Sequence, residues 1–117
     1  MTNEVLAMVD QELLGWPGVS TEPGRFASQT YLYGRREIGH VHRNSVADLP
    51  FPRAIHDELI AAGRAKPHQA GVAGFVSYPI RRPEDVPDAI ALFRQNYERT
   101  KEIAACRAAV AQAADGE

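Results

Sequence analysis

The sequence has little cysteine and no long apolar run, and both shortages limit where the protein can work. Cys106 is its one cysteine, so no disulfide can form within the chain. Chains without disulfides suit a reducing compartment such as the cytoplasm. No stretch approaches the roughly 20 apolar residues that cross a bilayer, and acidic side chains interrupt residues 1–16, unlike a secretory signal. The sequence therefore predicts a cytoplasmic protein without a membrane partner.

Motifs for several familiar activities are also missing. The chain has neither the G-x-S-x-G elbow of the α/β-hydrolases nor a glycine-rich phosphate loop between a strand and a helix. Its basic residues are dispersed rather than interleaved with aromatic ones, and the pI is near 6.1. These absences argue against an elbow serine hydrolase, a nucleotide-phosphate site and nucleic-acid binding.

What the sequence does have is a basic centre. The whole chain carries a net charge of -2, but residues 25–82 hold nine basic residues against four acidic ones, together with all four histidines. Such a centre fits a small anionic ligand, and it equally fits acidic flanking helices that neutralise the sheet they cover. Both interpretations stay open at this point.

Hydrophobic periodicity and turn residues predict the order of the elements. They are a helix over residues 3–14, a short strand near residue 19, strands over residues 25–33 and 36–43 joined by a turn at 34–35, a helix over 52–62, a strand over 75–80 and a helix from residue 85. The order α-β-β-β-α-β-α predicts a single α+β domain over residues 1–117, with a small antiparallel sheet and helices packed on one face. Residues 103–117 are rich in alanine and are expected to form a helical extension with a frayed end.

Two histidines occupy alternate positions in the segment REIGHVHRN, residues 36–44. Because side chains alternate across a strand, one face is predicted to carry Arg36, Ile38, His40 and His42, and the other Glu37, Gly39, Val41 and Arg43. The apolar Ile38 suggests that the histidine face lies beneath the helices. A pocket between sheet and helices would then bind a ligand through Arg36, His40, His42 and His68, which makes a ligand-binding or interaction module the first interpretation.

A second interpretation is a metal-assisted hydrolase or similar enzyme. Two imidazoles at this spacing can chelate one ion, but zinc takes three or four protein ligands. His68, in the loop AKPHQAG, completes a candidate set of His40, His42 and His68 for zinc or a similar divalent metal, with Asp48 or Asp57 as a further ligand or base. His56 is another candidate ligand. For nucleophilic catalysis, Ser45 lies near the histidine pair and strand pairing could bring Ser77 near it. A third interpretation is a structural homodimer that forms through an exposed strand edge or the alanine-rich last helix.

The chain also resembles a known family over about residues 15–100. The motifs that carry the resemblance are GHVH at 39–42, ADLPFP at 47–52 and PEDVPDAIALFRQNYER at 83–99. They are similar to those of small bacterial luciferase-domain proteins, a family of unknown function. The resemblance implies a single α+β domain in which Gly39, His40, His42 and residues 48–52 form a recurring unit. It does not imply light emission, because the chain is much shorter than the flavin-dependent barrel luciferases and lacks flavin and nucleotide fingerprints.

Overall fold

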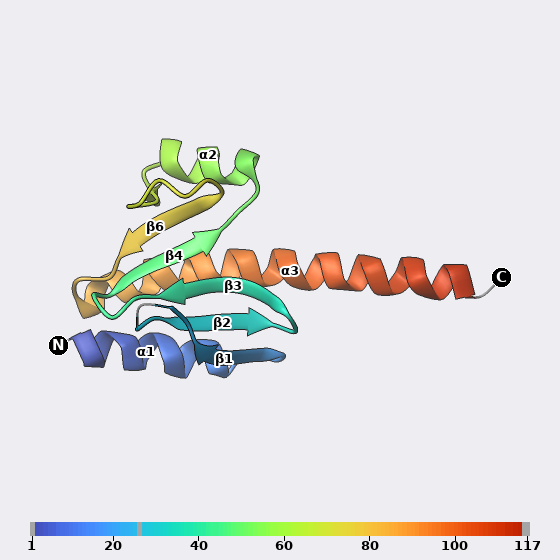
Figure 1. Ribbon diagram of the computed structural model, residues 1–117, viewed down its shortest axis with the longest axis horizontal. Helices are drawn as coiled ribbons and strands as arrows, with labels where there is room; N and C mark the ends of the chain where they lie inside the picture. The colour runs from blue at the N-terminus through green and yellow to red at the C-terminus, as the bar shows by residue number, and fades with distance from the viewer. Residues whose placement is uncertain (1, 26, 116–117) are drawn as a thin grey trace.

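The computed structural model describes residues 2–25 and 27–115, and within them six strands form one antiparallel sheet in the order β1-β2-β3-β4-β6-β5 (Figure 1). The elements along the chain are α1 (Thr2–Leu14), β1 (Val19–Pro23), β2 (Gln29–Tyr33), β3 (Arg36–Val41), β4 (Val46–Pro50), α2 (Arg53–Ala61), β5 (Lys66–Pro67), β6 (Phe75–Pro79), the 3-10 turn η1 (Pro83–Asp85) and α3 (Val86–Asp115). The predicted α+β class, with helices on one face of an antiparallel sheet, is confirmed.

Helices α1 and α3 cover the same face of the sheet. Tyr31 of β2 donates a hydrogen bond to Asp10 of α1 at 2.9 Å, and its ring meets that of Phe93 of α3 edge-on, with centroids 5.8 Å apart. The side chains that fill this layer are almost fully buried; they include Leu13, Ile38, Leu49, Val76, Phe93 and Tyr97. The stability of the fold therefore comes mainly from one side of the sheet, and the other side is left for polar groups.

Gly39 brings α3 close to the middle of β3. A Cβ atom at this position would lie 2.5 Å from Cε1 of Phe93 and 3.1 Å from Cγ of Leu49, so only glycine fits against the ring. Because the next residue is His40, the aromatic ring of α3 supports the backbone directly behind the histidines.

Strand β4 is absent from the elements predicted above, since Pro50 and Pro52 are residues that disfavour a strand. In the structure Pro50 is the last residue of β4, and Pro52 immediately precedes α2. β4 lies between β3 and β6, and Val46 to Leu49 are all buried. Its central position places Asp48 in the middle of the sheet.

Other local predictions agree with the structure. Gly34 and Arg35 form the two-residue turn between β2 and β3. Proline in a strand is typical of an edge or a bulge, but β6, which ends at Pro79, lies between β4 and β5. Since β5 pairs only with Val76 and Ser77, Pro79 has a strand neighbour on one side alone.

Helix α3 continues past the sheet, as Figure 1 shows, and its side chains from 104 to 114 are exposed. The helical extension predicted over residues 103–117 thus continues to Asp115, and the frayed end predicted for it is not tested, because residues 116–117 lie outside the described part of the chain. The strand predicted over 25–33 begins only at Gln29, and Phe26 is also outside the described residues. In the described part of the chain, no helix is both long and apolar enough to span a bilayer.

Candidate functional site

A register shift in β3 turns the histidines away from the helices. Tyr31 pairs with Gly39, but Leu32 pairs with Glu37, so Ile38 is the extra residue of a bulge. Ile38 is buried in the core, whereas Glu37 joins His40 on the open face. The predictions that Ile38 shares a face with the histidines, that Glu37 lies on the opposite one, and that a pocket lies beneath the helices are therefore wrong.

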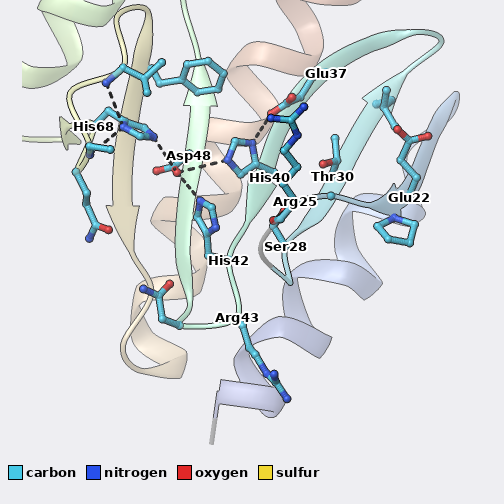
Figure 2. A pocket seen from close by; sticks show the side chains of 18 of the residues that line it. Glu22, Arg25, Ser28, Thr30, Glu37, His40, His42, Arg43, Asp48 and His68 are labelled. Atoms are coloured by element: carbon cyan, nitrogen blue, oxygen red, sulfur yellow. Dashed lines mark hydrogen bonds and ion pairs between the residues drawn. The ribbon is translucent and has the colours of Figure 1, made fainter.

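The histidines converge on one carboxylate oxygen, Oδ2 of Asp48 (Figure 2). Nε2 of His42 lies 2.7 Å from this oxygen, Nε2 of His68 lies 3.2 Å from it and Nε2 of His40 lies 3.4 Å from it. The rings of His40 and His42 are nearly perpendicular, with centroids 4.8 Å apart. The structure thus brings together the three histidines that the sequence analysis selected, around an aspartate that it had named only as an additional ligand or base.

Strand pairing explains how Asp48 is held. It lies opposite His40 on β3 and opposite Ser77 on β6, and the Ser77 hydroxyl donates a 2.6 Å hydrogen bond to Oδ1. Its side chain is only 4% exposed. One carboxylate oxygen therefore faces the histidines while the other is fixed within the sheet.

The backbone sets the protonation pattern of His68. Its Nδ1 accepts hydrogen bonds from the amides of Ala70 and Val72, at 3.1 and 3.3 Å. Since Nδ1 acts as an acceptor, the proton of the neutral ring is on Nε2 and points to Asp48. His68 therefore directs its N–H toward Asp48, and its Nε2 lies within ion-pair distance of the carboxylate.

His40 is held from both sides. Its Nδ1 lies 2.5 Å from Oε2 of Glu37, and its Nε2 faces Asp48. Hydrogen bonds to Asp48 and Glu37 outweigh the opposing effect of burial and raise the pKa of His40 to about 9. Burial disfavours the charge of Asp48, but hydrogen bonds from His40, Ser77 and His42 hold the pKa of that carboxyl well below its usual value. At neutral pH the pair is an imidazolium and a carboxylate.

This pairing predicts that metal-free protein loses stability as pH rises from about 6.5 to about 9. The pKa of His40 is 6.5 when unperturbed and about 9 in the folded protein, so the folded state binds this proton more tightly than the unfolded state does. The resulting stabilisation is fully present below pH 6.5 and is lost as the pH rises through about 9. The charged groups facing His40 are Glu37 and Asp48, with His42 and His68 alongside. Urea unfolding in the presence of a chelator should show a decrease of roughly 2 kcal/mol across this range.

A His40→Gln variant supplies the control for that measurement. It lacks the titrating ring, so its free energy of unfolding should change much less between pH 6.5 and 9. An equal decrease in the variant and the wild type would show that another group is responsible.

A groove of about 1020 Å³ opens over this cluster. Its lining combines the histidine cluster with basic and apolar side chains, among them Arg25, Arg35, Arg43, Leu32, Val72 and Phe75.

Other candidate residues lie outside the groove. Arg36, which was predicted to line the pocket, is exposed and is not part of this lining. Burial and the charge of Arg36 together lower the pKa of Arg99 on α3. His56 and Asp57 pair with each other on α2, away from the cluster.

Some lining residues had no recognisable signal in the sequence. Thr30 lines the groove because it pairs with His40 across β2 and β3, and Arg25 lies shortly before β2 in the chain. Glu37 could have been found only by anticipating the bulge.

Comparison with known proteins adds the family. A model described as luciferase domain matches residues 35–96, more than half of the chain. The chain belongs to the luciferase domain family. No curated protein and no solved structure matches it. The luciferase domain match includes Glu37, His40, Asp48, His68 and Ser77, so the whole cluster lies inside it, whereas Arg25 and Thr30 of the groove precede it.

Proposed function

We propose that this luciferase-domain protein binds a small anionic molecule in the groove above the histidine cluster. The observation that carries the proposal is the groove of about 1020 Å³ on the open sheet face, with His40, His42 and His68 in its lining. Its volume is in the range of small-molecule sites, and such sites place a few polar groups within a largely apolar lining.

The charge of the lining supports an anion. The groove has three carboxylates in its lining, of which Glu37 and Asp48 already contact histidines, while Glu22 takes part in no ion pair among the described residues. Among the described residues, Arg25 and Arg35 take part in none of the ion pairs, so their charges remain for a ligand. Arg43 points away from the histidines in Figure 2. The guanidinium group of Arg25 or Arg35 can hold a carboxylate or phosphate with two parallel hydrogen bonds.

The apolar part of the lining supports a ligand with a flat or apolar body. The ring of Phe75 has its centroid 5.8 Å from that of His40 and 5.9 Å from that of His68. Leu32 and Val72 add aliphatic surface to the groove. An aromatic carboxylate combines both properties, because its ring can stack on these side chains while its charge meets an arginine.

Thermal unfolding with benzoate and salicylate tests this function, with acetate as the comparison that lacks a ring. The measurements are made in a chelator, so that only the protein's own groups bind. Because a ligand that prefers the native state stabilises it by mass action, the aromatic acids should raise the unfolding midpoint more than acetate, and more with concentration. An Arg25→Gln variant should lose most of this rise.

Arg53→Gln is the matched control, since Arg53 lies on α2 with a side chain that is 94% exposed. This variant should respond to benzoate as the wild type does. The proposal fails if millimolar aromatic acids leave the midpoint unchanged, or if the two arginine variants respond alike.

A further inference from the structure

We infer that His40, His42 and Asp48 form a binding site for a divalent transition-metal ion, of which Zn²⁺ is the best match. Each residue offers one ligand atom, and these atoms all lie within 4.8 Å of one another. Imidazole nitrogen and carboxylate oxygen are zinc donors at about 2.0–2.2 Å from the ion. Nε2 of His42 and Oδ2 of Asp48 are now 2.7 Å apart. For both atoms to bind one ion at these distances, the gap between them must widen by less than about 1 Å.

The orientation of His40 also suits a metal ligand. With Nδ1 directed at Glu37, the neutral ring has its proton on Nδ1 and its lone pair on Nε2. That lone pair faces a carboxylate oxygen 3.4 Å away. In the metal-free protein the second proton of the imidazolium lies between the two atoms, and a metal ion would take its place. A carboxylate that accepts the other ring proton of a metal-bound histidine is also the usual support of such ligands.

His68 does not belong to the ligand set, in contrast to the set predicted from sequence. Its Nδ1 accepts two backbone hydrogen bonds, so Nε2 carries the proton and has no lone pair for a metal ion. Ser77 instead donates a hydrogen bond to Oδ1 of Asp48, and His68 lies at ion-pair distance from Oδ2. We assign them the role of fixing the carboxylate of the site.

Three protein ligands leave an open coordination position. Closed structural zinc sites use four ligands, whereas catalytic ones use three and leave the next position to water or substrate. Since His40, His42 and Asp48 all line the groove, the open position faces the space in which a small molecule would bind. The metal site does not rest on the proposed anion, because its ligands are complete without one.

Zinc binding is measured on the full chain after EDTA treatment and dialysis, by competition with a chromophoric chelator. We expect one Zn²⁺ per chain, and a loss of affinity of more than about 100-fold in His42→Gln. His68→Gln and Glu37→Gln should lose only about 10- to 100-fold, as expected for residues that orient ligands. His56→Gln changes a histidine outside the cluster and should bind as the wild type does.

Substitution by Co²⁺ gives an independent readout, because its visible absorption reports the number of ligands. His68→Gln should keep the wild-type Co²⁺ spectrum, whereas His42→Gln should lose it; circular dichroism confirms that both variants are folded. The inference is overturned if the folded wild type binds no Zn²⁺, if His56→Gln weakens binding as much as His42→Gln, or if His68→Gln abolishes the Co²⁺ spectrum. Anion binding in chelator is a separate measurement, so either result can fail alone.

Discussion

Replacing Asp48 by alanine is expected to lower the free energy of unfolding by about 3–5 kcal/mol at pH 7. The carboxylate is almost fully buried and faces three histidines and Ser77. Removal of the carboxylate leaves the charged His40 without one of its two acidic partners, and the hydroxyl of Ser77 without its acceptor. Urea unfolding of the metal-free variant and wild type measures the difference.

Asp57→Ala is the matched control, because Asp57 also pairs with a histidine but is 64% exposed. Its cost should stay within about 1 kcal/mol, as for other surface ion pairs. The cost of Asp48→Ala should also shrink near pH 9.5, where His40 is largely neutral even in the wild type. Equal costs for the two substitutions would mean that the cluster contributes no more than a surface pair.

The parts of the fold that sequence predicted are those governed by local pattern. Helices α1, α2 and α3 have apolar side chains at helical spacing, and the turn at Gly34 joins two strands rich in aromatic or β-branched residues. Strand β4 has no such pattern, because it is buried in the centre of the sheet and Val46 to Leu49 include an aspartate. Pro50 at its end and Pro52 just after it are also residues typical of loops.

The sequence predicted which histidines come together, but not the face of the sheet on which they lie. Alternation correctly placed His40 and His42 on the same side, and His68 joined them from a separate loop. The choice of face failed because a bulge at Ile38 reverses the alternation. That bulge is a tertiary effect: it lets Ile38 enter the core while Gly39 meets the ring of Phe93, and no local pattern records such packing.

The same packing connects the two faces of the sheet. The ring of Phe93 packs closely against the backbone of Gly39 on the helix side of the sheet. The next residue, His40, lines the groove on the other side. The core therefore holds the strand that carries the cluster, and a change in the core tests how firmly the site is held.

Phe93→Ala is expected to lower the free energy of unfolding by about 3–5 kcal/mol, because the ring is fully buried and its loss leaves a cavity between α3 and the sheet. The edge-on contact with Tyr31 is lost as well. Phe93→Leu retains part of the volume and should cost less. Urea unfolding of both variants gives the comparison, and a cost below 1 kcal/mol for Phe93→Ala would show that the ring is not part of a tightly packed core.

A double-mutant cycle with Gly39→Ala tests the contact itself. Alone, Gly39→Ala should cost about 1–3 kcal/mol, because its Cβ would overlap Cε1 of Phe93. In the Phe93→Ala background the new methyl group enters the cavity, so the same substitution should cost at least about 0.5 kcal/mol less. Additive costs would contradict the close approach of Gly39 and Phe93, and with it the account of why β3 presents His40 to the open face.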